Sequence, residues 1–237
     1  VVFLFFNYNR NMKYEILTIF PDILDSYVNK GMIRIAQEKK KIKIKTHNLR
    51  DFAVDNHGSV DDRPYGGGPG QVMMVEPIYK ALKKIRRLKK SKVILLSAKG
   101  KTWNQQMAQK FSKLDQLIFI CPRYEGHDER IKKFVDEEIA IGDYVLTGGE
   151  LGALVIIDST ARLIPGVLGK IESLENESHT TPGYLENPQY TRPETFSYKF
   201  KNSKNRFTTK NLKVPEVLLS GHHKNIEDWR EKNSKNN

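Results

Sequence analysis

The chain alternates short apolar runs with helix-like stretches over most of its first 168 residues, and this alternation is the strongest constraint on its fold. Four apolar runs resemble buried strands, and a fifth run alternates lysine with isoleucine as a half-exposed strand does. The buried strands are expected at 14–20, 93–97, 117–121 and 139–146, and the half-exposed one at 41–46. Helices are expected at 21–36, with a weak point at Gly31, and at 76–90, 104–111, 128–135 and 149–163. The alternation predicts an α/β domain built on a mainly parallel sheet.

Composition divides the chain into four segments. Residues 1–11, VVFLFFNYNRN, precede Met12 and are expected to be an upstream extension outside the fold or the result of a mis-set start. The α/β domain is expected at 12–168, followed by a polar linker at 169–188 and a small basic segment at 189–237. Between Glu194 and Glu216 the basic segment has six basic residues, four interleaved aromatic residues and no acidic one.

The formal net charge of the chain is +12, and the sequence pI is about 9.6. This balance favours a polyanion as partner, because many weak Lys and Arg contacts to phosphates add up and release counterions. The other reading is a lysine-rich composition spread over every surface. Cys121 is the only cysteine, so no disulfide forms within the chain and a reducing cytoplasm is expected. No apolar run reaches the roughly 18 residues of a membrane span, so no membrane partner is expected.

Two glycine-containing loops lie between residues 121 and 150, each entered from an apolar run. In parallel α/β sheets, ligands bind at the carboxyl ends of strands, where glycine lets them approach the backbone. The sequence TGGE at 147–150 has the spacing of a capping box, and its glycines are expected to leave amides facing a polar ligand group. A tight turn with positive φ explains the same glycines equally well. Neither GxGxxG nor GxxxxGK[ST] occurs, which weakens nicotinamide and nucleoside triphosphate readings.

A third glycine-rich loop, DDRPYGGGPG at 61–70, is bounded by two prolines. A loop that is flexible at its centre and restricted at its ends suits closing on a flat substrate such as a base. A disordered surface loop is the alternative, although Arg63 and Tyr65 are unusual residues for a mere linker.

Six motifs stand in the order found in the bacterial tRNA (guanine-N1)-methyltransferase family, TrmD, which the chain resembles from about residue 12 to residue 231. They are DDRPYGGGPG (61–70), RYEGHDER (123–130), IGDYVLTGGE (141–150), IPGVLG (164–169), PQYTRPE (188–194) and VPEVLLSG (214–221). Six motifs in order are far more specific than any single one.

The resemblance implies a SPOUT-class enzyme with a mainly parallel sheet, a trefoil knot in the C-terminal part of that domain, and a small, basic, mostly helical C-terminal domain. Threaded chains are rare, so the sequence pattern by itself does not predict the knot. The resemblance also implies a cytoplasmic homodimer with its active sites at the interface. S-adenosylmethionine would be the methyl donor, and N1 of the guanine immediately 3′ of the tRNA anticodon (guanine 37) the acceptor, a modification that prevents frameshifting.

Site residues follow from the motifs. The resemblance assigns cofactor binding to three loops, with the residues Leu96, Ser97, Ala98, Pro122, Tyr124, Glu125, Gly126, Ile141, Gly142, Asp143, Tyr144, Val145, Leu146, Gly148 and Gly149. The loop expected to cover the target guanine contributes Asp61, Arg63, Tyr65, Gly66, Gly67, Gly68 and Gly70. Basic residues of the helix at 76–90 and of the C-terminal segment are expected to hold tRNA phosphates.

The reaction needs a base that removes the proton from N1 of guanine and a cation beside the guanine oxygen. By position, Arg162 matches the family's arginine for that oxygen, while by itself it reads as an arginine complementing a helix dipole. The family's base is a linker aspartate before a serine, and the matching residue here is Glu177, followed by Ser178. Without the resemblance, Glu177 would be one of several solvated linker carboxylates.

Several positions depart from the family pattern. Pro122 stands at a usual glycine and removes an amide donor, so cofactor affinity is expected to change. Further departures are Ala98 and Gly152 at usual prolines and His222 at a usual asparagine. The chain ends soon after Trp229, so tRNA binding is expected to be weaker or to move onto residues 195–213.

The histidines show no metal-ligand spacing with the lone cysteine, so no metal site is predicted from the pattern. Magnesium dependence in the family nevertheless makes Mg²⁺ a second cofactor to consider, held by carboxylates such as Glu125 or Glu177. Two alternatives stay open. One is a related methyltransferase acting on another RNA, and the other is an RNA-binding protein that has lost catalysis.

Overall fold

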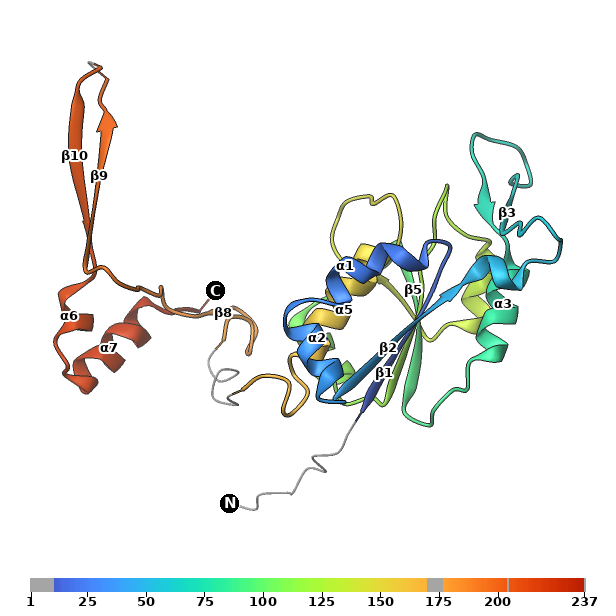
Figure 1. Cartoon of the computed structure of the whole chain (residues 1–237), viewed down its shortest axis with the longest axis horizontal. Helices are drawn as coiled ribbons and strands as arrows, with labels where there is room; N and C mark the ends of the chain where they lie inside the picture. Colours follow the sequence, from blue (N-terminus) through green and yellow to red (C-terminus); the bar gives the residue numbers. More distant parts are fainter. Residues whose placement is uncertain (1–10, 170–176, 204, 237) are drawn as a thin grey trace. The chain divides into compact units, whose positions relative to one another are not determined.

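The computed structural model describes residues 11–169, 177–203 and 205–236. The chain divides into two compact units, Val1–Glu172 and Ser173–Asn237 (Figure 1). Residues 1–10 of the expected extension and residues 170–176 of the expected linker lie outside the described residues.

The first unit is built on a five-stranded parallel sheet, which confirms the predicted α/β class. The strand order is β2-β1-β6-β5-β7, so two connections skip over neighbouring strands, the one from β2 to β5 and the one from β6 to β7. The strands are β1 (Met12–Thr18), β2 (Ile42–Asn48), β5 (Ser91–Thr102), β6 (Gln116–Ile120) and β7 (Glu137–Ala140). Central strand β6 is buried along its whole length, as a strand covered on both faces must be.

Alternate side chains of β1, β5 and β6 enter two separate cores. In β6, Leu117 and Phe119 pack into one core, whereas Ile118 and Ile120 pack into the other. This follows from the two-residue period of a strand, which sends successive side chains to opposite faces. The near-continuous apolar runs in the sequence are therefore the signature of a sheet with both faces covered.

Helices cover both faces of the sheet (Figure 1). One face carries α1 (Asp25–Val28), α2 (Gly31–Glu38), α4 (Gln105–Phe111) and α5 (Glu150–Ala161). The opposite face carries α3 (Val75–Lys84) with the 3₁₀ helices η2 (Leu49–Phe52) and η3 (Glu129–Phe134). A short hairpin of β3 (Asp61–Asp62) and β4 (Val72–Met73) flanks the loop at 63–71.

Three expected elements differ from the structure. The helix expected at 21–36 is interrupted: η1 (Pro21–Leu24) and α1 precede an extended Lys30, and Gly31 opens α2 with φ +54°, which a continuous helix does not allow. The strand expected at 139–146 ends at Ala140, because Gly142 begins a turn that Tyr144 closes by donating its N–H to the Gly142 carbonyl (2.9 Å). The helix expected at 128–135 is the 3₁₀ helix η3.

The second unit is mixed rather than mostly helical. It contains α6 (Glu216–Leu219) and α7 (His223–Asn233), but residues 195–213 form a β-hairpin of β9 (Thr195–Lys201) and β10 (Phe207–Lys213). A second antiparallel pair joins β8 (Tyr184–Leu185) to β11 (Lys235–Asn236). The alternation FSYKFK in β9 is the period of a strand, so the sequence did carry the signal.

None of the helices in the described ranges combines the length and the apolar character that crossing a bilayer needs.

Gly100 allows β5 to approach β7 closely, and replacing this glycine tests the packing at this edge of the sheet. The pairing shifts between Leu96 and Lys101, and a Cβ atom at position 100 would lie 2.6 Å from the backbone carbon of Ile139. We expect Gly100→Ala to lower the free energy of unfolding by about 2 kcal/mol, a typical cost of overpacking, in urea denaturation of the full chain. Gly169→Ala is the control, since a Cβ there meets nothing within 4 Å. Equal effects of the two substitutions would contradict this packing.

Candidate functional site

A cavity of about 310 Å³ lies at the ends of β6 and β7 and beside residues 96–99 of β5, at the edge of the sheet where open α/β folds bind ligands. Its walls come from this stretch of β5, where the pairing with β7 is irregular, from the loops after β6 and β7, and from the start of α5. Every residue expected to bind a cofactor lines this cavity except Asp143. The structure therefore brings together segments that are separated by about fifty positions in the sequence.

Other residues also line the cavity, and of these only Lys99 and Arg123 fall within the loops at 96–100 and 122–126 that the resemblance assigns to the cofactor. These other residues are Lys99, Arg123, His127, Glu129, Ile139, Ala140, Thr147 and Gly152. Arg123, His127 and Glu129 belong to the motif RYEGHDER, so the extent of this motif in the sequence indicated that they lie near the site. Ile139 and Ala140 are the last residues of β7 and form part of an apolar wall.

The capping box predicted at 147–150 does not form. The residue that caps α5 is Gly149, and no side chain caps the helix. The Gly149 N–H donates to the carbonyl of Pro122 (3.0 Å), so this amide is not free for a ligand. A Cβ on Gly149 would lie 2.7 Å from the Cα of Cys121, which shows that glycine is needed for close packing of the two loops.

Glu150 is used for a tertiary network instead of the cap. It is 2% exposed and accepts a hydrogen bond from Thr18 Oγ1 at 2.6 Å. Its Oε2 lies 3.0 Å from Nε of Arg123, and the guanidinium of Arg123 stacks over the ring of Phe20. The network joins the end of β1 to the loop after β6 and the start of α5, and the last two of these line the cavity.

Tyr124 connects the cavity to the loop at 61–70. It adopts a left-handed conformation, φ +60°, which is uncommon for a residue other than glycine. Partial burial, and then a hydrogen bond with Asp61, raise the pKa of Tyr124. The neighbouring Glu125 N–H donates to the Gln71 carbonyl (2.9 Å), and the Met73 N–H donates to the Gly126 carbonyl (3.0 Å). The base of the expected guanine loop is therefore fixed to a wall of the cavity.

The centre of that loop is open. Tyr65 is fully exposed, and Gly66, Gly67 and Gly68 all have positive φ, with no atom within 4 Å of where a Cβ atom would lie. Gly70 is different, because a Cβ there would lie 2.9 Å from Oε1 of Glu125. Asp61 lies at the ordered base of the loop, while Arg63 is exposed.

The two expected catalytic residues do not line the cavity. Arg162 follows the last residue of α5, whereas the cavity lies at the first, and twelve residues of helix separate the ends by about 18 Å. Glu177 belongs to the second unit, where its carbonyl accepts hydrogen bonds from the N–H and the hydroxyl of Thr180 (3.1 and 2.6 Å).

Two further features of the described residues concern Cys121 and the groups that could hold a metal ion. Burial raises the pKa of the Cys121 thiol well above its ordinary value, and the thiol is fully buried, so it stays protonated. Within the described ranges no group of three or more His, Cys, Asp or Glu residues is arranged to hold a metal ion.

Comparison with known proteins identifies the family. The family model described as tRNA (Guanine-1)-methyltransferase TrmD matches residues 12–237. Proteins named tRNA (guanine-N(1)-)-methyltransferase from Clostridium perfringens (strain SM101 / Type A) and Clostridium botulinum (strain Hall) are each 48% identical over 223 residues, which is 94% of this chain and 88% and 87% of theirs. One from Dictyoglomus turgidum is 48% identical over 221 residues, covering 93% of this chain and 84% of its own.

Removing Arg123 tests the buried network. Arg123→Ala leaves the carboxylate of Glu150 buried without its cation, so we expect the free energy of unfolding to fall by about 3 kcal/mol in urea denaturation. Arg34→Ala, which breaks an exposed pair with Glu38, is the matched control and should cost less than about 1 kcal/mol. Similar losses in both variants would show that the network is not a special constraint.

His127 predicts a pH dependence of stability. Burial lowers its pKa below the ordinary value of 6.5, against the opposing effect of Glu129 and Glu138. As the pH falls, the unfolded chain therefore protonates His127 before the folded chain does. The stability that neutral His127 contributes is complete above about pH 6.5 and is lost as the pH falls below it. We expect unfolding free energies measured between pH 8 and pH 5 to fall more steeply for the wild type than for His127→Gln. Parallel curves would contradict this role.

Proposed function

The chain belongs to the TrmD family of tRNA (guanine-N1)-methyltransferases, and we propose that it transfers the methyl group of S-adenosylmethionine to N1 of guanine 37 in tRNA. The observation that carries the proposal is the cavity beside β5 and at the ends of β6 and β7, lined by residues of the motifs RYEGHDER and IGDYVLTGGE. The relatives' names supply the reaction, and the cavity supplies a place for the methyl donor.

The residues of the cavity suit a nucleoside cofactor. Leu96, Ile139 and Ile141 offer apolar contacts to a flat adenine, and the surrounding loops present backbone groups at short range because glycines keep side chains away. Pro122 offers no amide, and its carbonyl is already used by Gly149. When bound, S-adenosylmethionine supplies an electrophilic methyl group, and the chain's own part is to orient it and exclude water.

We assign the trefoil knot of this superfamily to residues 91–161. The support is the tight passage of Gly149 against Cys121 and Leu96, together with the position of β5 between β6 and β7 in the sheet. A chain that leaves β7 and returns at this distance to the loop after β6 has the close approach that a knotted crossing requires.

Guanine N1 carries a proton at neutral pH, so methylation needs a base. We assign this role to Glu177 and the stabilisation of the guanine oxygen to Arg162. The carboxylate of Glu177 reaches one methylene further than the family's aspartate. The loop at 61–70, with Tyr65 exposed and its base attached to Tyr124 and Glu125, is suited to cover the guanine.

The position of Arg162 favours a homodimer whose sites are shared. Arg162 lies at the end of α5 opposite the cavity of its own chain, about 18 Å away along the helix. Exposed apolar residues lie on α5 and on the neighbouring η1 and α1, which form a patch suited to a partner: Ile23, Tyr27, Leu151 and Val155. Two copies related by a two-fold axis with antiparallel α5 helices would bring the Arg162 of each to the cavity of the other.

The reaction is tested with labelled S-adenosylmethionine and tRNA transcripts that carry guanine or adenine 3′ of the anticodon. We expect label only in the guanine transcript and a loss of about 10² to 10⁴ in rate for Glu177→Gln, the usual contribution of a general base. Glu186→Gln, another carboxylate of the second unit, is the matched control and should keep full activity. Label in the adenine transcript would refute the substrate, and full activity of Glu177→Gln would refute the base.

Mixing two inactive variants tests whether the site is shared. Ala98→Trp blocks the cavity from an exposed position, while Glu177→Gln leaves the cavity intact. If each site combines the cavity of one chain with Glu177 of the other, half of an equal, re-equilibrated mixture is heterodimer, and each heterodimer has one complete site. We expect the mixture to recover about a quarter of wild-type activity. If the mixture is no more active than the sum of the two variants measured alone, the cavity and Glu177 of each site belong to one chain.

Binding of the cofactor alone is measured by thermal unfolding, since a ligand that binds only the folded chain raises its melting temperature. A shift without turnover on any RNA would favour an RNA-binding protein that has lost catalysis. Turnover on another RNA, but not on tRNA, would favour a methyltransferase of different specificity.

A further inference from the structure

The β9–β10 hairpin is an arm that has almost no core of its own. Of its described residues from Thr195 to Lys213, all but Tyr198 and Asn202 are exposed. Figure 1 shows the two strands extending away from α6 and α7 of the same unit. A two-stranded hairpin by itself is marginally stable in water, so an arm of this length gains from a partner that covers it.

The register of the hairpin separates two faces. Phe196, Tyr198 and Phe200 alternate along β9 and therefore share one face, with Tyr198 opposite Lys210. Their ring centroids follow each other at 6.0 and 5.9 Å. The other face carries the side chains that alternate with these, which include Lys199, Lys201 and Lys213. The arm is thus a row of aromatic rings on a basic ribbon.

The charge of the arm selects the class of partner. Six basic residues and no acidic one lie between Glu194 and Glu216, so a polyanion is the complementary surface. The aromatic row adds a requirement for flat apolar groups, since Phe196 is 55% and Phe200 39% exposed. Nucleic acid meets both conditions at once, with phosphates for the lysines and bases for the rings.

The spacing of the rings favours unpaired nucleotides. Bases in a duplex strand are stacked about 3.4 Å apart, and their faces are covered by each other. Rings about 6 Å apart instead suit an extended strand whose bases are separated and can each stack on a side chain. We propose that the β9–β10 hairpin is an RNA-binding arm, whose Phe196–Tyr198–Phe200 row stacks on unpaired bases of the tRNA while Lys210, on the same face, contacts the phosphates of that strand and the lysines of the other face contact further phosphates. The identity of the RNA as tRNA rests on the proposed function.

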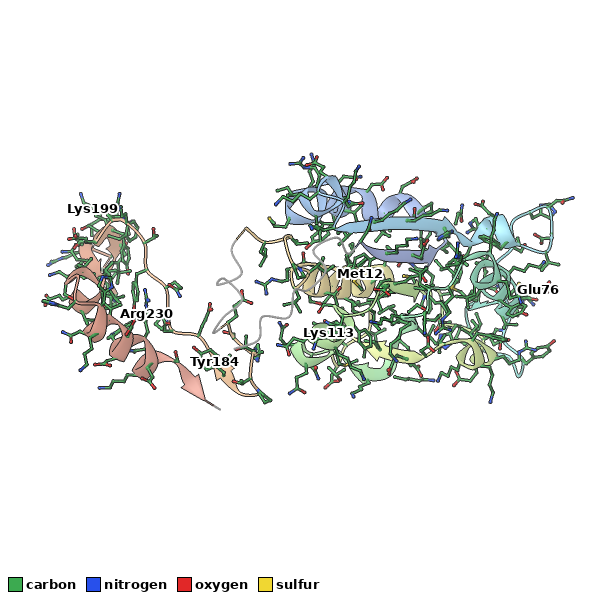
Figure 2. All side chains as sticks on the ribbon, turned by 90° about the horizontal axis from the view of Figure 1, so that it is seen from below. Met12, Glu76, Lys113, Tyr184, Lys199 and Arg230 are labelled. Carbon is green, nitrogen blue, oxygen red and sulfur yellow. The ribbon has the colours of Figure 1, made fainter. Side chains whose placement is uncertain are left out.

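A second feature at the base of the arm fits the same partner. The hairpin is closed where the Val214 N–H donates to the Glu194 carbonyl (2.9 Å), and both residues line a cavity of about 400 Å³ within the second unit. The cavity walls also include Gln189, Arg192 and Arg230, whose side chains are donors of the kind that read base edges and phosphates. Figure 2 shows Lys199 on the hairpin and Arg230 on α7 of this unit.

The test measures RNA binding by the full chain with fluorescence anisotropy. The probes are a fluorescein-labelled single-stranded RNA decamer and the same strand in duplex with its complement. The double variant Phe196→Ala/Tyr198→Ala is expected to bind the single strand at least tenfold more weakly, because stacking on each ring contributes about 1 to 3 kcal/mol. Duplex affinity, which depends on the lysines, should change less than threefold.

Matched variants distinguish stacking from general damage. Tyr198→Trp keeps an aromatic surface and should bind the single strand with wild-type affinity. Ser197→Ala/Thr209→Ala changes only the opposite face and should also leave the affinity unchanged. Lys210→Gln, on the aromatic face, should weaken binding of the single strand and lower the slope of log affinity against log salt by roughly 0.7, the value of one phosphate contact for single strands. All these residues except Tyr198 are exposed, so melting temperatures should stay the same.

Two results would overturn the proposal. One is an aromatic double variant that binds single-stranded RNA with an affinity within twofold of the wild type. The other is a change in the oligomeric state of that variant, measured by sedimentation, which would make the aromatic row a protein interface.

A methyl-transfer assay separates this proposal from the proposed function. With an active wild type, the aromatic variant should raise the KM for tRNA about tenfold and keep kcat. With a wild type inactive on every RNA, the proposed function fails, and the anisotropy data still decide whether the arm binds RNA.

Discussion

The buried carboxylate of Glu150 is the constraint on which the rest of the site depends. An ionised group at 2% exposure is costly unless it is paired, and here Thr18 and Arg123 supply the partners. These three residues belong to the end of β1, the loop after β6 and the start of α5. Because a buried charge tolerates little displacement from its partners, the three segments hold fixed relative positions. Two of these segments, the loop after β6 and the start of α5, also line the cavity.

Much of the sheet was predictable, because its physics is local. Side chains of β6 alternate between two cores, so the sequence shows a continuous apolar run, and glycine-rich motifs at strand ends indicated the cavity loops. The predicted capping box failed for a non-local reason: Arg123, distant in sequence, binds the Glu150 carboxylate that the cap would have used. The strand expected at 139–146 failed because Gly142 allowed a turn where apolar composition favoured extension. The segment at 195–213 is basic and aromatic, and the two-residue alternation of its side chains also indicates the strands of the hairpin.

The positions of Arg162 and Glu177 were predictable only through family resemblance. Neither residue has a local pattern that marks it for chemistry, and the structure places Arg162 at the far end of the helix that begins at the cavity. Helix α5 is apolar on nearly all sides, burying Ile156 and Ile157 while exposing Leu151 and Val155. A helix with that composition is expected to be covered all round, and in the proposed homodimer its exposed apolar residues would face the second copy.

The closure of the β9–β10 hairpin has a consequence for how this protein can vary. Lys213 pairs with Thr195, and the next residues outward, Val214 and Glu194, are joined by a backbone hydrogen bond. The chain therefore enters and leaves the arm at the same place. Residues between these two points can be lengthened, shortened or exchanged for a tight turn without moving the segment that precedes them or α6 that follows. The arm is a separable module, open to evolutionary change and to grafting, on a unit whose remaining architecture does not depend on it.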